Sequence, residues 1–327
     1  MARRNRYYSG PVSGNFDGTR FFIEGHSGAR TREVIKWNLT SSPKRWPRRL
    51  NNGKYPLPPQ RVTGSDILCT WVGQATALIQ VQGLNIITDP FFSKRASPLR
   101  WVGPQRVRPP GIALADLPPI DIVLVSHNHY DHMDLPALRH IAKRWAPRIV
   151  TPLGNAAIIR RCRAKSDITE LDWWQTVTVS GFNITATPTF HWSKRGLRDR
   201  NHALWSAFGI ETGAGFIYFG ADTGYGDGST FRDIRQRFGT PRLSLLPIGA
   251  YEPRWFMKQE HMNPDDAVRA HLDLESATSI AIHHSTVRLT DEAIDAPTQA
   301  HREALQRHDV PTDRFRLIEA GETLSVP

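Results

Sequence analysis

The chain has 327 residues, of which 39% are hydrophobic and 22% are charged, and its formal net charge is +11 at pH 7. This composition is that of an ordinary globular chain, long enough to bury a sizeable core in one large domain or two small ones. Only two cysteines, Cys69 and Cys162, are present, which excludes a disulfide framework and a Cys-x-x-Cys zinc site.

Residues 1–63 are predicted to form a basic, Pro- and Gly-rich N-terminal arm, either loosely structured or wrapped on the body. The first 60 residues hold twelve Lys and Arg against three Asp and Glu, together with Trp37 and Trp46. Such a segment suits an anionic membrane surface or another polyanion, with a solvated solubility segment as the alternative.

No apolar stretch of signal-peptide length follows the basic start of the chain, and no run of about 18 apolar residues occurs that could span a membrane. We therefore expect a cytoplasmic protein whose membrane contact is peripheral, on the inner face of the membrane.

The body is predicted to open with three short strands, Asp66–Trp71, Ala77–Val81 and Leu84–Thr88, which form an antiparallel meander. The following segment, Phe91–Pro119, contains eight Pro or Gly among basic and aromatic residues. A loop of this length in a compact domain is commonly functional. We interpret it as a lid on the substrate side, with irregular packing as the alternative.

Four potential metal ligands follow the next predicted strand, Ile120–Val125: His127, His129, Asp131 and His132. Asp134 is expected to cap a helix, Leu135–Trp145, so these residues occupy a loop at the carboxyl end of a strand. In an extended loop, His127, His129 and Asp131 can converge while His132 points elsewhere. Imidazole and carboxylate groups suit zinc. Four ligands exceed what one ion with an open water position needs, which suggests two metals. A His-rich surface turn is the alternative.

The rest of the chain alternates predicted strands with predicted helices. Strands are expected at Arg148–Thr151, Asp167–Leu171, Thr176–Val179, Phe182–Thr187, Phe216–Phe219, Leu243–Ile248, Ser279–Ile282, Phe315–Ile318 and Thr323–Val326, and helices at Asn155–Arg163, Pro264–Leu272 and Ala300–Arg307. Two halves of similar content favour an α/β sandwich with sheets inside and helices outside.

Four more polar side chains follow these predicted strands: His191, Asp222, His261 and His283. His191 and His283 stand at strand ends, where further ligands are expected. Glycines on either side of Asp222 allow a sharp turn that brings its carboxylate to a strand end, where it could bridge two cations. His261 precedes a helix and could act as an active-site acid. The alternatives are a packed or capping role for His191, a plain turn at Asp222 and a surface position for His261.

Taken together, these residues resemble the metallo-β-lactamase fold, in which two sheets pack face to face and metals sit at one edge. Longer strings resemble the N-acylphosphatidylethanolamine-hydrolysing phospholipase D family. They are Leu117-Pro-Pro-Ile-Asp121, Ser126-His-Asn-His-Tyr-Asp-His132, Glu170-Leu-Asp-Trp-Trp174, Gly220-Ala-Asp-Thr-Gly-Tyr225 and Pro247-Ile-Gly-Ala-Tyr-Glu-Pro-Arg-Trp-Phe-Met257. The resemblance implies a four-layer αββα sandwich, with residues 64–327 as the catalytic domain.

The resemblance also implies a role for each site residue. His127, His129 and His191 would hold a first zinc; Asp131, His132 and His283 would hold a second, and Asp222 would bridge them. Iron and manganese are alternatives to zinc. His261 corresponds to an additional active-site histidine and is expected to be catalytic together with Asp131. The residues expected against the substrate are Tyr130, Arg100, Trp101 and Tyr251.

Three positions depart from the family pattern. Gln74 stands where the family usually has a histidine, and it cannot take a proton. His284 replaces the usual tryptophan, and the string Ala281-Ile-His-His284 aligns His283 with the metal ligand. The pair Arg100-Trp101 replaces a polar–aromatic pair that meets the lipid head group.

The activity implied by the resemblance is that of a metal-dependent hydrolase, a di-zinc phosphodiesterase of the phospholipase D type. It would cleave N-acylphosphatidylethanolamine-like phospholipids to N-acylethanolamine and phosphatidic acid by attack of a metal-bridging hydroxide. The expected partners are two metal ions and a phospholipid at a membrane surface, and a homodimer is left open. The concentration of charge in the arm argues against nucleic acid. The alternatives are a metal-dependent lactonase or nuclease on the same fold, and a non-catalytic, metal-stabilised membrane-binding scaffold.

Overall fold

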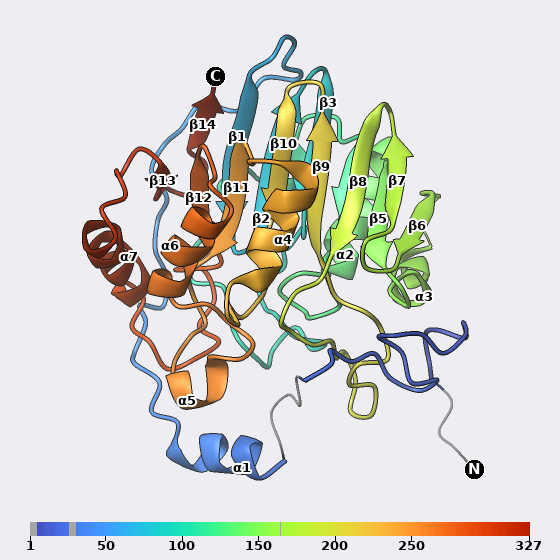
Figure 1. Cartoon of the computed structure of the whole chain (residues 1–327), viewed down its shortest axis with the longest axis vertical. Helices are drawn as coiled ribbons and strands as arrows, with labels where there is room; N and C mark the ends of the chain where they lie inside the picture. The colour runs from blue at the N-terminus through green and yellow to red at the C-terminus, as the bar shows by residue number, and fades with distance from the viewer. Residues whose placement is uncertain (1–4, 26–30, 164) are drawn as a thin grey trace.

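The computed structural model describes residues 5–25, 31–163 and 165–327, which contain two seven-stranded sheets packed face to face (Figure 1). In spatial order the first sheet consists of β14 (Thr323–Val326), β1 (Ile67–Gly73), β2 (Thr76–Val81), β3 (Leu84–Thr88), β4 (Ile122–Leu124), β5 (Arg148–Pro152) and β6 (Ile168–Leu171). The second consists of β13 (Phe315–Arg316), β12 (Ser279–Ile282), β11 (Leu243–Pro247), β10 (Gly215–Phe219), β9 (Ala207–Thr212), β8 (Phe182–Thr187) and β7 (Thr176–Val179).

Helices cover the outer face of each sheet. The first sheet is covered by α2 (Leu135–Trp145), α3 (Ala156–Ile159) and the 3₁₀ turn η2 (Arg160–Cys162), and the second by α4 (Ser229–Phe238), α6 (Pro264–Asp273) and α7 (Ala296–Arg307). The remaining helical segments are α1 (Thr31–Thr40), η1 (Leu114–Asp116) and α5 (Arg254–Met257). Between the sheets lies a core of buried side chains from both, including Trp71, Ile79, Phe208 and Ile217. The predicted four-layer α/β sandwich is therefore confirmed.

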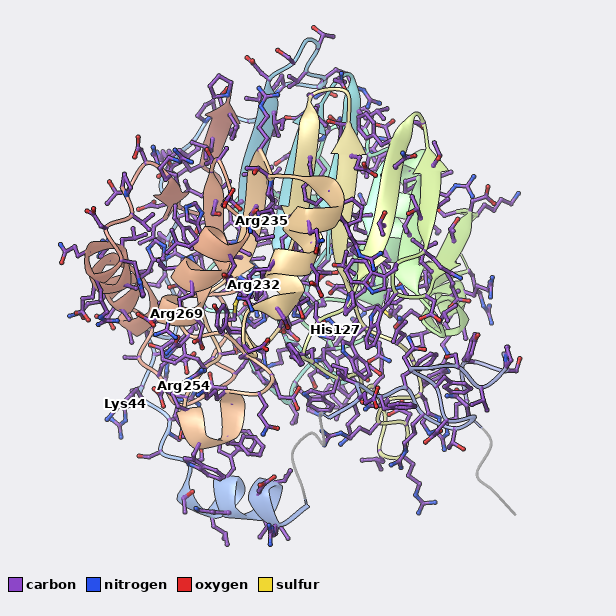
Figure 2. The ribbon with its side chains drawn as sticks, in the orientation of Figure 1. Lys44, His127, Arg232, Arg235, Arg254 and Arg269 are labelled. Carbon is purple, nitrogen blue, oxygen red and sulfur yellow. The ribbon has the colours of Figure 1, made fainter. Side chains whose placement is uncertain are left out.

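Strand direction brings the functional loops to one edge of the sandwich. β10 and β11 are parallel, as are β11 and β12, and β8 runs with β10 because both pair antiparallel with β9. The carboxyl ends of β8, β10 and β12 therefore meet at the same edge. The loop after β4 joins them, because the backbone N–H of Ser206 donates to the carbonyl of Ser126 (3.0 Å). Figure 2 labels His127 at this lower edge.

Most of the predicted elements are confirmed, some to the residue. α2 begins after Asp134, whose side chain accepts from the N–H of Ala137, and α6 begins with a capping box on Asn263. The predicted helix Asn155–Arg163 is instead split into α3 and η2. Five of the described elements were not predicted: α1, which lies in the arm, η1, β9, α4 and α5.

The described part of the N-terminal arm lies against the body. Phe16 and Phe21 are buried in one cluster with Leu204 and Trp205. Further along, the indole N–H of Trp46 donates to the carbonyl of Glu292 (2.9 Å). Of the two forms considered for the arm, the segments of it that the structure describes have the wrapped one; the domain boundary at residue 63 stays a prediction.

Two buried histidines outside the site predict acid sensitivity. His271 and His301 both pack on Phe315, and burial lowers the pKa of each to about 4. These folded-state pKa values lie below the pKa of histidine in the unfolded chain. The contribution of the two neutral rings to the free energy of unfolding is therefore complete above about pH 6.5 and is lost as the pH falls toward 4. Each group contributes a slope of about 1.4 kcal/mol per pH unit in that window.

We therefore expect urea unfolding to show about 2–3 kcal/mol less stability at pH 5.5 than at pH 7 from these two groups. The variant His301→Leu should lose about half of that pH dependence. His140→Gln, which replaces an exposed histidine, serves as the control and should keep it. An unchanged slope in His301→Leu would show that His301 does not titrate in this window.

Candidate metal centre

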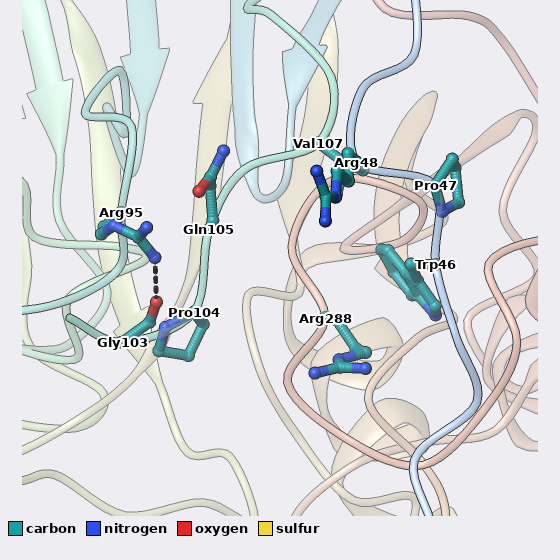
Figure 3. A pocket seen from close by; sticks show the side chains of 9 residues that line it. All are labelled: Trp46, Pro47, Arg48, Arg95, Gly103, Pro104, Gln105, Val107 and Arg288. Atoms are coloured by element: carbon teal, nitrogen blue, oxygen red, sulfur yellow. Dashed lines mark hydrogen bonds between the residues drawn. The ribbon is translucent and has the colours of Figure 1, made fainter. Parts of the chain in front are cut away.

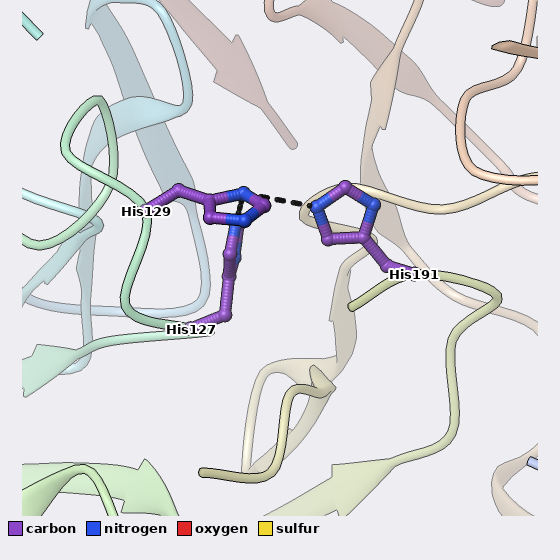
Figure 4. Close-up of side chains that lie close together, drawn as sticks. All are labelled: His127, His129 and His191. Carbon is purple, nitrogen blue, oxygen red and sulfur yellow. Dashed lines mark hydrogen bonds between the residues drawn. The ribbon is translucent and has the colours of Figure 1, made fainter. Parts of the chain in front are cut away.

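The first group of ligand candidates consists of three histidines that face a common point (Figure 4). His127 Nε2 lies 2.9 Å from His129 Nδ1, and His191 Nε2 lies 3.3 Å from the same atom. Nitrogens that share one tetrahedral zinc at about 2.0 Å stand about 3.3 Å apart, so this spacing suits one ion. The arrangement joins the loop after β4 to the segment after β8.

The protonation of this group also suits a metal. Burial lowers the pKa of His129 to about 3 and the pKa values of His127 and His191 well below their usual range. His191 Nδ1 lies 3.1 Å from the carbonyl of Glu260, to which it donates, so its Nε2 lone pair is free to face the group. Three neutral imidazoles thus present lone pairs to one point, an arrangement that a cation stabilises.

The second group consists of Asp131, His132 and His283. His132 Nε2 lies 3.4 Å from Asp131 Oδ2 and 3.3 Å from His283 Nε2, and the last two atoms lie 3.3 Å apart. The prediction that Asp131 converges with His127 and His129 was wrong in its geometry. The chain turns at this point, with the N–H of Met133 donating to the carbonyl of His129 (2.8 Å), so Asp131 and His132 face the same way.

Asp222 lies between the two groups. Its Oδ2 is 3.1 Å from His132 Nε2 and 3.7 Å from His191 Nε2, and its Oδ1 is 3.3 Å from His283 Nε2. Burial acts to raise the pKa of Asp222, but the nearby His132, His283 and His261 together outweigh it and hold the pKa well below its usual range. Asp222 is therefore an anion shared by both groups, at the position that a bridging ligand would occupy.

Asp89, which directly follows β3, was not predicted to be functional. Its Oδ2 accepts from His132 Nδ1 (2.6 Å), and its Oδ1 accepts from the N–H of Ser126 (2.7 Å). This contact fixes the His132 ring so that Nε2 faces the second group. The one available signal was an acidic residue at a strand end, Asp89-Pro90.

We expect Asp89→Asn to weaken metal binding about ten- to hundredfold, because the amide is a poorer acceptor for the His132 N–H. Asparagine tolerates the left-handed backbone of Asp89 (φ 34°), so the fold should persist. The measurement is a competitive titration with a chromogenic chelator. Asp116→Asn, on the exposed turn η1, is the matched control. Wild-type affinity in Asp89→Asn would contradict the orienting role.

Gln74 also contacts the second group. It sits at the tight turn between β1 and β2, and its Nε2 donates to Asp131 Oδ2 (2.9 Å) and lies 2.9 Å from His283 Nε2. His284 points elsewhere, because its ring stacks on Trp71 with centroids 4.6 Å apart. This placement separates the two adjacent histidines, with His283 in the group and His284 in the core.

The two groups open into a cavity of about 430 Å³. Tyr130 and His261 line it with Asp131 and Asp222, and its other walls are mainly apolar: Val34, Trp37, Trp192, Phe256, Met257 and Leu289. The His261 ring lies 5.0 Å from that of His191 and 5.8 Å from that of His283, and burial lowers its pKa.

The remaining residues expected against the substrate lie elsewhere. Arg100 lines a neighbouring cavity, Trp101 is 72% exposed, and Tyr251 is buried. Their contact with substrate stays a prediction.

Comparisons with known proteins agree with this architecture. Residues 84–284 match the family model of the Beta-lactamase superfamily domain. The chain is 37% identical over 284 residues to N-acyl-phosphatidylethanolamine-hydrolyzing phospholipase D 1 of Caenorhabditis elegans, covering 81% of this chain and 79% of that protein. It is 35% identical over 260 residues to the mitochondrial N-acyl-phosphatidylethanolamine-hydrolyzing phospholipase D of Saccharomyces cerevisiae, covering 78% of this chain and 55% of that protein.

Among solved structures, Igni18, a metallo hydrolase from Ignicoccus hospitalis, superposes with a TM-score of 0.59 at 16% identity. The match covers 80% of this chain and 99% of Igni18. This similarity concerns the fold, and it confirms the predicted metallo-β-lactamase architecture.

Proposed function

The chain belongs to the β-lactamase superfamily and is a metal-dependent hydrolase related to the N-acyl-phosphatidylethanolamine-hydrolysing phospholipases D, and we propose that it hydrolyses a phospholipid of that kind. The bond cleaved would be the phosphodiester bond on the head-group side. The products would be an N-acylethanolamine and phosphatidic acid.

The observation that carries this proposal is the pairing of two ligand groups with an apolar cavity. His127, His129 and His191 would hold one zinc ion, Asp131, His132 and His283 a second, and Asp222 would contact both. Nitrogen and carboxylate donors of this kind suit zinc, with iron or manganese as competitors. When bound, such a pair of ions supplies an activated water and neutralises charge that develops at phosphorus.

The side chains around the two groups have distinct tasks in this proposal. His261 lines the cavity together with Asp131 and Asp222, and in this proposal its imidazole donates to or accepts from a substrate oxygen. The apolar wall formed by Trp37, Phe256 and Met257 excludes water and accommodates acyl chains. The ring of Trp37 stacks on that of Phe256 with centroids 5.0 Å apart, so α1 of the arm helps to form this wall.

A membrane surface is the proposed place of action. Ile35 and Leu39 on α1 are 55% and 81% exposed, and Trp255 on α5 is 48% exposed beside Lys36. A further cavity of about 520 Å³ is lined by Trp46 and by the guanidinium groups of Arg48, Arg95 and Arg288 (Figure 3). Exposed apolar and aromatic groups next to cations suit an anionic lipid surface. Within the described ranges, no helix has the length and apolar character needed to cross a membrane.

The test is a panel of substrates given to the zinc-loaded protein: N-acylphosphatidylethanolamine, a simple phosphodiester, a lactone and RNA. We expect release of N-acylethanolamine from the phospholipid at a rate well above the turnover of the other three. Faster turnover of the lactone or of RNA would replace the proposal by a lactonase or a nuclease. No turnover of any substrate by metal-loaded protein would favour a binding scaffold.

A further inference from the structure

A second cavity, of about 850 Å³, lies beside the cavity of the metal centre, and Tyr130 lines both. Its walls come from the N-terminal segment, the loop after β3, the start of α2 and the loop that follows His191. Six cationic side chains contribute to its lining: Arg6, Lys94, Arg95, Arg100, Arg161 and Arg195. Arg95 also lines the cavity that contains Trp46, and none of the six cations has a task in the hydrolysis step proposed above.

Among the residues that the structure describes, two carboxylates line this cavity, and both accept hydrogen bonds from other donors. Asp134 accepts from the N–H groups of Phe92 (2.9 Å) and Ser93 (2.7 Å). Asp199 accepts from the hydroxyl of Tyr7 (2.6 Å) and the N–H of Gly196 (2.7 Å). In the described part of the chain, no ion pair joins either carboxylate to one of the six cations. Because six cations face two carboxylates, the lining of this cavity has an excess of positive charge.

Arg195 is the cation that connects this cavity to the metal centre. Its guanidinium group lies 4.0 Å from the centre of the Tyr130 ring, and its Nη1 donates to the carbonyls of Asn128 (3.0 Å) and Met133 (2.7 Å). Burial lowers the pKa of Arg195. A cation held in a partly buried place by a ring and neutral carbonyls favours an anion nearby.

We propose that this cavity is a second binding site, separate from the metal centre, for a phosphomonoester dianion such as that of phosphatidic acid or free phosphate. A phosphomonoester carries a charge of about −1.5 to −2 at pH 7, more than the single charge of a phosphodiester, and presents three acceptor oxygens. Guanidinium forks match these oxygens. Phosphatidic acid as the natural source rests on the proposed function, because it would be the product; the binding of the phosphomonoester does not.

The binding site also reaches the reaction loop. The two carbonyls held by Arg195, at Asn128 and Met133, flank the ligands Asp131 and His132. An anion that contacts the guanidinium group of Arg195 therefore affects the backbone segment that positions these two ligands. We expect occupancy of this cavity to change turnover as well as to bind product.

The experiment is calorimetric titration of the zinc-loaded full chain with three probes: inorganic phosphate, dihexanoyl phosphatidic acid below its micelle concentration, and dihexanoyl phosphatidylcholine. Phosphate and phosphatidic acid should bind, and the diester should not. The double variant Lys94→Gln/Arg161→Gln should weaken binding of both at least about tenfold, because two charge-assisted contacts are lost. The control Lys143→Gln/Arg302→Gln, which has the same net charge, should bind as the wild type does.

His283→Ala separates this cavity from the metal centre. Binding should survive in that variant; its loss there would place the phosphate at the metals and overturn the proposal. Wild-type affinity in the Lys94/Arg161 double variant, or binding of dihexanoyl phosphatidylcholine as tight as that of phosphate, would overturn it as well. If the double variant does not fold, Arg6→Gln on the N-terminal segment takes its place in the titration, and weaker binding is again the expected result. Because the readout is binding, failure of the substrate panel leaves this result standing.

Discussion

Replacing His283 by alanine is expected to abolish turnover. Its Nε2 lies 3.3 Å from His132 Nε2, Asp131 Oδ2 and Asp222 Oδ1, so the change removes a donor from the second ligand group and leaves two buried carboxylates less compensated. Loss of an outer partner of a metal ligand costs about ten- to hundredfold, and loss of a ligand itself should cost more than about 100-fold. The measurement is turnover, together with the zinc content of the purified variant.

The neighbouring residue provides the matched control. His284→Ala removes a ring that stacks on Trp71 and faces away from the ligand groups, so zinc content and turnover should remain close to wild type. Some stability should be lost, because a buried side chain is truncated. If His284→Ala is instead the inactivating change, the assignment of ligands in this segment is shifted by one residue.

The second large effect is expected for Asp222→Asn. This carboxylate faces nitrogens of His132, His191 and His283, so it belongs to both ligand groups at once. Replacing its charge by a neutral amide of the same size should weaken both sites and lower turnover by about 10³-fold, the scale seen when a major charge-stabilising group is removed. Turnover and the number of zinc ions per chain should fall together.

Asp227→Asn is the control for that variant. Asp227 lies five residues further along the chain, is exposed, and accepts from Ser229 Oγ (2.6 Å) outside both groups. It should retain metal and turnover. An Asp222→Asn protein with two bound zinc ions and full turnover would show that the carboxylate does not bridge the groups.

The sequence predicted the site best where potential metal ligands directly follow the end of a predicted strand. The Asp134 cap, the helix α2 and the strand before it were predicted from local patterns, and these features fix the loop that carries His127 to His132. The closeness of His191, Asp222 and His283 depends on strand order across two sheets. Local pattern could place each of them at or near a strand end, but the family resemblance was needed to group them.

Other features could not be predicted because they depend on contacts between distant segments. The alternation expected for an extended loop failed because the chain turns at Tyr130 to His132. Asp89 acquires its importance only when the end of β3 meets the loop after β4. α4 was missed because only Phe231 and Ile234 of its polar sequence are buried. α1 was missed because its Trp37 packs on Phe256 of α5, which lies more than 200 residues away in sequence.

The central claim is that this chain holds two metal ions at the edge where the two sheets meet, and that hydrolysis depends on them. The measurement that tests it most directly is native mass spectrometry of the purified chain, paired with a turnover assay, before and after dialysis against a chelator and after zinc is returned. We predict two zinc ions per chain, loss of both ions and of turnover in the chelator, and recovery of both on adding zinc. Full turnover by metal-free protein, or a chain that takes up no metal, would contradict the account.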